Sequence, residues 1–251
     1  MDVDRLTKGG PPPPPVNLAD VGQIIQKMTN FVGQRMEVVI GDYRHWFHQI
    51  QAPTELQRLF GLKVGAQIYR WLMLPMGWGW SPYFAQVCAW ATLAFRTKEE
   101  ESILMEECFK EGELLPTFVR TRCGGFVTVY YDNFIVVTPS PREADDLHKR
   151  WRVNATPERT GAVIKTGSLH RFTHREIAAT GFDFLGLHLQ TEVDALDKNR
   201  VSSLSWHPCK LQRWSEKFPP DFSPRRRVKL QSGSDGWCSV VRWLMHLSEE
   251  Y

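Results

Sequence analysis

The sequence predicts an α+β fold, because strand patterns and helix patterns follow one another in an order that suits antiparallel pairing. The 251 residues suffice for one or two domains with a sizeable core. Hydrophobic residues make up 42% and charged residues 24%, and the 10 Trp and 14 Phe add further apolar bulk. We therefore do not expect a mainly disordered chain.

Charge and cysteine content argue against several classes of protein. The net charge of +3 is too small to indicate a nucleic-acid partner by itself. The 5 cysteines are odd in number and form no C-x-x-C pair, which speaks against a disulfide scaffold or a zinc ribbon. They favour a reducing intracellular compartment, the cytoplasm or the nucleus. No apolar run reaches the roughly 18 to 20 residues of a membrane span, and the first residues lack the apolar region of a secretory signal.

The first half of the chain predicts a linker, a helix, a strand and a hairpin, in that order. The run Pro11–Pro15 is too stiff for a helix or a sheet and suits a solvated spacer or arm. Apolar side chains at helical spacing predict a helix over residues 21–28, and alternation predicts a strand over 36–42. Residues 59–64 and 67–72 flank a Gly-Ala pair and predict a hairpin.

The next segments predict a helix followed by a meander of strands. Pro82 opens a helical stretch with a broad apolar face. Residues 98–113 contain 7 Glu and 2 Lys, so we expect an exposed acidic helix or an insertion. Residues 118–122, 126–130 and 134–137 read as three strands joined by short turns.

Two further elements complete the α+β assignment. Pro141 begins a helix that we expect to continue through Trp151. Residues 182–189 read as one strand, and the sequence contains no internal repeat. Mixed helices and antiparallel strands are the pattern of an α+β protein.

Two aspartates occupy unusual positions. Asp42 ends the apolar strand VVIGD, and Asp132 lies in a tight turn within VTVYYDNFIVV. A carboxylate among apolar residues is costly to bury unpaired, and each one alone suits a turn cap or a salt bridge. Two at strand ends could converge on one sheet edge and hold divalent cations through oxygen ligands. Paired cations of this kind stabilise the attacking and leaving oxygens in phosphoryl transfer.

Five segments resemble the motifs of reverse transcriptases, and they occur in the order of that family. GDYRHWFHQI resembles the first metal-binding motif, LPMGWGWSPYFAQ the second, and VYYDN the Tyr-x-Asp-Asp turn. Residues 164–169 resemble the downstream lysine motif, and residues 184–186 the primer-grip strand. Each motif alone is weak, whereas the ordered set is specific. The details are most similar to retroelement polymerases of the long-terminal-repeat or tyrosine-recombinase type.

The resemblance implies a right-hand polymerase palm with partial fingers and a partial thumb, and it assigns catalytic roles. Asp42 and Asp132 would be the principal ligands of two Mg²⁺ ions, with Mn²⁺ as a substitute. Lys165 would stabilise the pyrophosphate leaving group, although a solvated lysine is the alternative. Phe47 would lie beneath the nucleotide sugar and exclude a 2′-hydroxyl, although a core aromatic is the alternative.

Further residues would contact the nucleotide and the template. Met76 and Gly77 would form the floor of the nucleotide pocket, and Gln86 would face the template side. Tyr130 and Tyr131, which precede Asp132, would belong to the same nucleotide site. The implied partners are an RNA template, a DNA primer and deoxynucleoside triphosphates.

The primer and the duplex would contact the last third of the chain. Phe184, Leu185 and Gly186 would position the primer 3′ end, although a plain core strand is the alternative. The tail is locally basic with interleaved tryptophans, which suits a nucleic-acid backbone or a solvated basic surface. Its expected backbone contacts include Arg225, Arg226 and Arg227.

The motif positions divide the chain into expected regions. They are a proline-rich arm and finger remnant (1–16), a first palm segment (17–51), a fingers segment (52–75), a second palm segment (76–190, with the acidic insertion 98–113) and a thumb-like tail (191–251). Trp78, within the second motif, is expected to pack rather than to contact a ligand.

The sequence also departs from the family pattern. Asn133 stands where a second Asp is usual, Trp46 replaces a small residue beside the triphosphate, and Ala85 replaces an aromatic residue. An indole at position 46 could obstruct the nucleotide. The basic finger strands are largely missing, and the stretch between Gln86 and Asp132 is long. These departures indicate a weakened or inactive copy, or a fragment of a polyprotein.

Three interpretations follow. The first is an RNA-directed DNA polymerase core of a retroelement. The second is a catalytically silent polymerase-like fold that binds RNA or protein. The third is an unrelated globular module with chance motifs, which a sheet bearing Asp42 and Asp132 side by side would exclude.

Overall fold

The computed structural model describes residues 12–100 and 114–209. The chain divides into two compact units. Unit 1 comprises the residues up to Ala19 together with Met36–His174, and unit 2 comprises Asp20–Arg35 and the residues from Arg175 onward. Helices and antiparallel sheets are mixed in the described chain, so the predicted α+β class is confirmed.

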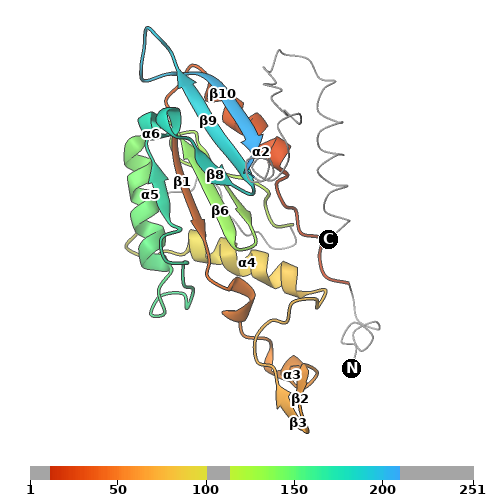
Figure 1. The fold of residues 1–251 in the computed structure, drawn as a ribbon. Coiled ribbons are helices and arrows are strands. Elements are labelled where there is room, and N and C mark those ends of the chain that lie inside the picture. Colours follow the sequence, from red (N-terminus) through yellow and green to blue (C-terminus); the bar gives the residue numbers. More distant parts are fainter. Residues whose placement is uncertain (1–11, 101–113, 210–251) are drawn as a thin grey trace, which may run out of the picture. The chain divides into compact units, whose positions relative to one another are not determined.

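Unit 1 is built on a five-stranded antiparallel sheet in the order β4-β5-β6-β1-β7, of which β1 and β6 are labelled in Figure 1. Strand β1 therefore lies between β6 and β7, and it carries Asp42 at its end. The strands are β1 (Glu37–Asp42), β4 (Val119–Arg120), β5 (Phe126–Tyr130), β6 (Asn133–Thr138) and β7 (His170–Phe172).

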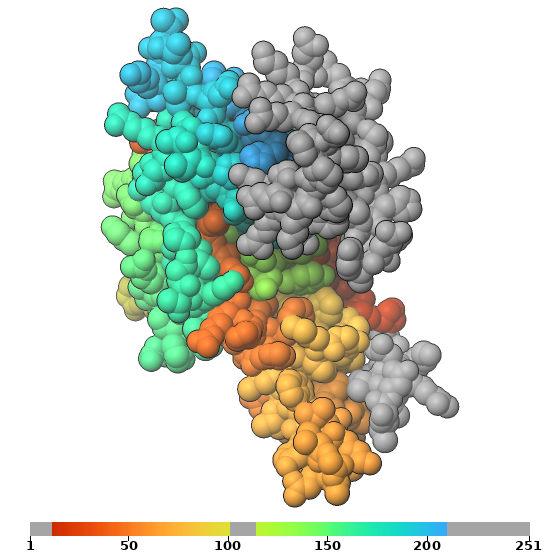
Figure 2. All heavy atoms as spheres, in the orientation of Figure 1, coloured from red at the N-terminus to blue at the C-terminus, as the bar shows by residue number. Residues whose placement is uncertain are grey.

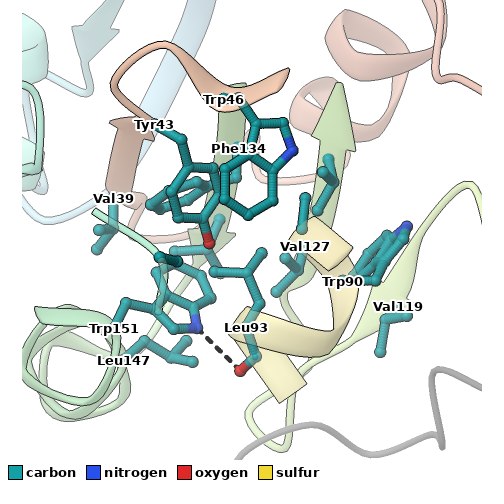
Figure 3. Packing of buried hydrophobic residues seen from close by; sticks show 14 of the residues in the cluster. Val39, Tyr43, Trp46, Trp90, Leu93, Val119, Val127, Phe134, Leu147 and Trp151 are labelled. Carbon is teal, nitrogen blue, oxygen red and sulfur yellow. Dashed lines mark hydrogen bonds between the residues drawn. The ribbon is translucent and has the colours of Figure 1, made fainter. Parts of the chain in front are cut away.

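Helices α4 (Ser81–Ala94) and α5 (Pro141–Asn154) pack on one face of this sheet. Each has a proline in its first turn, where the missing N–H has no intrahelical partner to lose. Their apolar faces meet the side chains of β1, β5 and β6 in one core cluster (Figure 3). The indole Nε1 of Trp151 donates a hydrogen bond of 3.1 Å to the Leu93 carbonyl and so ties α5 to α4.

Strand β1 is an interior strand, and its first three residues are buried although their side chains alternate between the two faces of the sheet. Glu37, which alternates with apolar residues in the sequence, is fully buried. Its carboxylate accepts a hydrogen bond of 3.1 Å from Arg171 of β7. The charge of Glu37 is therefore paired, which makes its burial tolerable.

The segment between β1 and α4 contains short elements. They are a 3₁₀ turn, η1 (Trp46–His48), helix α3 (Thr54–Gln57) and a hairpin of β2 (Gly61–Val64) and β3 (Gln67–Arg70). The hairpin confirms the predicted one, and Gly65 adopts a φ of 61° in its turn. Every residue of β2 and β3 is exposed, and Figure 2 shows the hairpin in orange as a protruding tip.

Unit 2 contains helix α2 and a three-stranded antiparallel sheet in the order β10-β9-β8. Helix α2 confirms the predicted amphipathic helix, and Asp20 and Gln23 form a capping box at its start. The elements are α2 (Val21–Thr29), α6 (His174–Ala179), β8 (Phe182–Phe184), β9 (Leu187–Val193) and β10 (Val201–Pro208).

The prediction of one strand over residues 182–189 was wrong. The segment is a hairpin, in which β8 and β9 are joined by Leu185 and Gly186. These two residues have φ values of 47° and 77°, the pair of positive angles that a type I′ turn requires. The apolar residues alternate before the turn (Phe182, Phe184) and after it (Leu187, Leu189), but the turn shifts the alternation by one residue, which the one-strand prediction did not take into account.

Several predictions fall outside the described residues. They concern most of the proline-rich arm, the acidic segment beyond residue 100, and Arg225, Arg226 and Arg227. Within the described ranges, Cys88, Cys123 and Cys209 are free thiols. None of the helices over residues 12–100 and 114–209 is long and apolar enough to cross a membrane.

We expect Gly41→Ala to destabilise unit 1. Gly41 pairs with Phe134 across β1 and β6, and an added Cβ would lie 2.1 Å from Cζ of the Phe134 ring. Forcing the ring aside should cost about 1–3 kcal/mol of unfolding free energy, measured by urea denaturation. Gly79→Ala is the control, because an added Cβ there meets nothing within 4 Å. Equal effects at both positions would contradict the prediction.

Candidate active site

The two aspartates singled out in the sequence lie at one end of the unit 1 sheet, where β1 ends and the β5–β6 turn lies. This end, with Asp42, Asp132 and Asn133, is called the Asp42 edge below. Asp42, the last residue of β1, is the cross-strand partner of Asn133, the first residue of β6. Asp132 precedes Asn133 in the two-residue turn that joins β5 to β6. The Tyr43 N–H donates a hydrogen bond of 2.8 Å to the Asp132 carbonyl. The expectation that one aspartate ends a central strand and the other lies in the adjacent hairpin turn is confirmed.

The negative charge of Asp42 acts on the Asp132 carboxyl group. Burial raises the pKa of the Asp132 carboxyl group, and the negative charge of Asp42 raises it further. Asn133 acts in the opposite direction, because its Nδ2 donates a hydrogen bond of 2.9 Å to Oδ1 of Asp132. The arrangement therefore concentrates negative charge where a cation would stabilise the ionised form of Asp132.

The Lys165 loop contributes a positive charge to this edge. Nζ of Lys165 lies 3.3 Å from Oδ2 of Asp42, and the lysine side chain is 62% exposed. The loop is fastened by backbone contacts, since the Lys165 N–H donates to the Asp42 carbonyl at 2.8 Å. Ser168 adds a clamp that the sequence did not predict: its Oγ accepts from the Asp42 N–H at 3.2 Å and lies 2.9 Å from the Asp42 carbonyl oxygen.

Gln86 supports the turn from beneath, which differs from the expectation that it would face the template. The residue is fully buried in α4. Its Nε2 donates to the Val129 carbonyl at 2.8 Å, and its Oε1 accepts from the Tyr131 N–H at 2.9 Å. Gln86 lies three residues before Ala89 and four before Trp90, both buried, so helical spacing already marked it as part of the inner face.

The Tyr131 backbone is strained. Its φ of 53° is in the left-handed region, which a bulky side chain rarely adopts. Strain of this kind costs about 1–3 kcal/mol and persists where the surroundings enforce it. Here the hydrogen bond from the Tyr131 N–H to Gln86 supplies that restraint. The turn that carries Asp132 is thus held in one conformation.

The aromatic residues around the turn are only partly buried. Phe47 is half-buried, and its ring centroid lies 6.2 Å from that of Tyr131. The Tyr131 ring makes an edge contact of 5.4 Å with Tyr130. Phe47 therefore lies beside the Asp132 turn, and it also packs partly against the hydrophobic core.

The remaining predicted residues lie in turns or in unit 2. Met76 is 70% exposed, and Gly77 adopts a φ of 93° beside it. Trp78 is buried against Phe60, as expected for a packing residue. Phe184, Leu185 and Gly186 belong to the β8–β9 hairpin of unit 2, with Phe184 buried.

Trp46 is a core residue, so the expectation that its indole obstructs a nucleotide was wrong. It is 3% exposed and stacks on Tyr43 with ring centroids 4.3 Å apart (Figure 3). Its Nε1 donates a hydrogen bond of 2.9 Å to the carbonyl of Ala85. Trp46 and Ala85, two of the departures from the reverse transcriptase motifs, are therefore related. The large side chain at position 46 packs in the same core as the small one at position 85.

A separate cavity of about 530 Å³ lies at the other end of the β5–β6 hairpin. Its lining includes Cys123, which precedes β5, and Ser140, which follows β6. Glu143, in the same lining, is buried and accepts hydrogen bonds from the hydroxyls of Thr121 and Thr138 and from the Cys123 N–H. Those bonds satisfy the carboxylate, so Glu143 holds α5 to the sheet.

The donors at the Asp42 edge fit a hard divalent cation. Two carboxylates and the side-chain oxygen of Asn133 are the oxygen donors that Mg²⁺ and Mn²⁺ prefer. Across the described ranges 12–100 and 114–209, no three His, Cys, Asp or Glu side chains form a group that could hold a metal ion. A cation at this edge would therefore depend on the two aspartates and on oxygen atoms from outside the protein, such as those of a bound nucleotide.

Comparison with known proteins does not assign the chain to a family. No protein-family model matches it, and no curated protein matches it significantly. The functional assignment therefore depends on the geometry of the Asp42 edge and on the motif resemblance.

We expect Trp46→Ala to unfold the protein more easily rather than to open a site. Loss of the buried indole should lower the free energy of unfolding by about 3–5 kcal/mol, measured by chemical denaturation. Trp46→Phe is the matched variant, because it keeps a ring against Tyr43 and removes the hydrogen bond to Ala85 together with part of the buried volume; it should cost about 1–2 kcal/mol. A Trp46→Ala protein of normal stability would contradict the core assignment.

Proposed function

We propose that this chain is the catalytic core of an RNA-directed DNA polymerase from a retroelement. The observation that carries the proposal is the meeting of Asp42 and Asp132 at adjacent ends of β1 and the β5–β6 hairpin, with Nζ of Lys165 at 3.3 Å from Asp42. The reaction would be attack of a primer 3′-hydroxyl on the α-phosphate of a deoxynucleoside triphosphate, with pyrophosphate as the leaving group.

Each of these side chains has a definite task in this reaction. Asp42 and Asp132 would hold two Mg²⁺ ions, which supply positive charge against the phosphate oxygens when bound. Lys165 can place its exposed ammonium group near the leaving pyrophosphate as a proton donor or as a charge. Gln86 keeps Tyr131, and with it the Asp132 turn, in the required conformation.

The nucleic-acid partners in this proposal are an RNA template and a DNA primer. The primer-grip role of Leu185 and Gly186, which form the β8–β9 turn of unit 2, stays a prediction of the motif resemblance. The exposed β2–β3 hairpin lies within residues 52–75, and in this proposal it would be part of the fingers. The five-stranded sheet of unit 1 would be the polymerase palm.

A catalytically silent fold that binds RNA or protein is the second candidate. It is favoured by the way the carboxylates are already used: Asn133 donates to Asp132, and Lys165 pairs with Asp42. A cation would have to compete with both contacts. Asn133 also supplies no negative charge where the family pattern has a second Asp.

A primer-extension assay on a primed homopolymer, with Mg²⁺ or Mn²⁺, tests the two candidates. We expect incorporation of deoxynucleotides by the unaltered chain and a loss of about 100-fold or more in Asp42→Asn. Asp197→Asn, which alters an exposed ion pair in unit 2, is the control and should be neutral. Binding of RNA with no incorporation under any condition would favour the silent fold.

Phe47→Val should relax the choice of sugar. If the ring excludes a 2′-hydroxyl, its truncation should raise ribonucleotide incorporation by about 10- to 100-fold while deoxynucleotide use changes little. Single-nucleotide kcat/KM values for both nucleotide types measure this effect. An equal loss with both types would instead indicate that Phe47 serves only the core.

Asn133→Asp should make stability depend on the divalent cation. The added carboxylate lies beside Asp132, so without Mg²⁺ we expect Tm to fall by about 2–4 °C, and with Mg²⁺ we expect that loss to be recovered. Polymerase activity in Mg²⁺ should rise, and Mn²⁺ should partly rescue the unaltered chain. Asn199→Asp, at an exposed position, is the charge-matched control. The same Tm change with and without Mg²⁺ would contradict this prediction.

A further inference from the structure

We propose that Gln49 is a positioning residue, which holds the Lys165 loop against the end of β1 and so sets the place of Lys165 beside Asp42. The importance of this placement for catalysis rests on the proposed polymerase function. Gln49 follows η1 directly and is half-buried. It has no assigned role in the chemistry described above.

The Gln49 side-chain amide pairs with one residue of the loop in the way a neighbouring strand would. Its Oε1 accepts from the Val163 N–H at 2.6 Å, and its Nε2 donates to the Val163 carbonyl at 3.0 Å. Nε2 also donates to the Arg44 carbonyl. Both hydrogen-bonding groups of Val163 thus bond to a single side chain.

The Gln49–Val163 hydrogen bonds extend a short backbone contact between the segment after β1 and the Lys165 loop. Tyr43 and Ile164 form an isolated antiparallel bridge, flanked by the Arg44 N–H to the Val163 carbonyl at 3.0 Å and the Lys165 N–H to the Asp42 carbonyl at 2.8 Å. A bridge of this length gives few hydrogen bonds to resist opening. Gln49 adds side-chain hydrogen bonds at its end.

The position of the Lys165 ammonium group depends on this contact. The lysine side chain is 62% exposed, so core packing does not hold it. The loop backbone therefore decides whether Nζ stays near Oδ2 of Asp42. Gln49 also closes η1, since its own N–H donates to the Trp46 carbonyl at 3.0 Å. One residue thus connects the turn that carries Phe47 to the loop that carries Lys165.

Amide hydrogen exchange tests the proposal without any need for catalysis. In protein labelled with [¹⁵N]lysine, Gln49→Leu should speed exchange of the Lys165 N–H by roughly tenfold. That N–H does not contact Gln49, so its exchange reports the loop as a whole. Gln190→Leu is the matched control, because Gln190 is a half-buried glutamine in unit 2 that donates to the Ala178 carbonyl. Unchanged exchange at Lys165 in a folded Gln49→Leu protein would overturn the proposal.

A second variant covers the case in which Gln49→Leu does not fold. Gln49→Glu keeps the acceptor for the Val163 N–H and removes the donor to two carbonyls, so exchange at Lys165 should again increase. Unchanged exchange in that variant would overturn the proposal equally.

Steady-state kinetics then connect the loop to the reaction. Gln49→Leu should lower kcat with little change in the KM for nucleotide, and combined with Lys165→Met it should cost no more than Lys165→Met alone. Additive losses would overturn a role through Lys165. If the unaltered chain does not polymerise and Lys165 exchange still increases, the proposed function fails while the positioning role stands.

Discussion

The antiparallel register between β1 and β6 is the constraint on which the candidate site depends. It pairs Asp42 with Asn133 and therefore brings Asp42 beside the turn that carries Asp132. A slip by one residue would move Asp42 to the opposite face of the sheet. The register is fixed by burial, since β1 and β6 are both largely buried strands, and by the close fit of the Phe134 ring over Gly41.

Polar side chains stabilise the irregular backbone around this pair. Gln86 holds the strained Tyr131 turn from below, and Gln49 holds the Lys165 loop from the side. Trp46 stabilises the same region through its stack on Tyr43 and its hydrogen bond to the Ala85 carbonyl. Amide side chains suit this task because each one offers a donor and an acceptor, so it can replace a missing strand partner.

The two carboxylates of the site can bind a cation or be compensated by neighbouring groups of the protein. Burial and the negative charge of Asp42 raise the pKa of Asp132, and a bound cation would relieve the repulsion between the two carboxylates, while Asn133 and Lys165 compensate them within the protein itself. A polymerase needs the bound cation, whereas a silent binding fold needs only the compensation within the protein. In the proposed function, the residue at position 133 would act on cation binding through charge rather than shape, because Asn and Asp are nearly isosteric.

The sequence by itself determined the α+β class, helices α2, α4 and α5, and the β2–β3 hairpin, because periodicity and turn residues are local signals. The expectation that Asp42 and Asp132 meet came from their positions at strand ends and from the motif resemblance. Only the tertiary structure decided what each side chain contacts. It buried Gln86 and Trp46, and it added Ser168 and Gln49 around the aspartates. It also divided residues 182–189 into two strands, since reversal at Leu185 depends on pairing between β8 and β9. Such contacts join residues that local patterns treat separately, so periodicity carries no information about them.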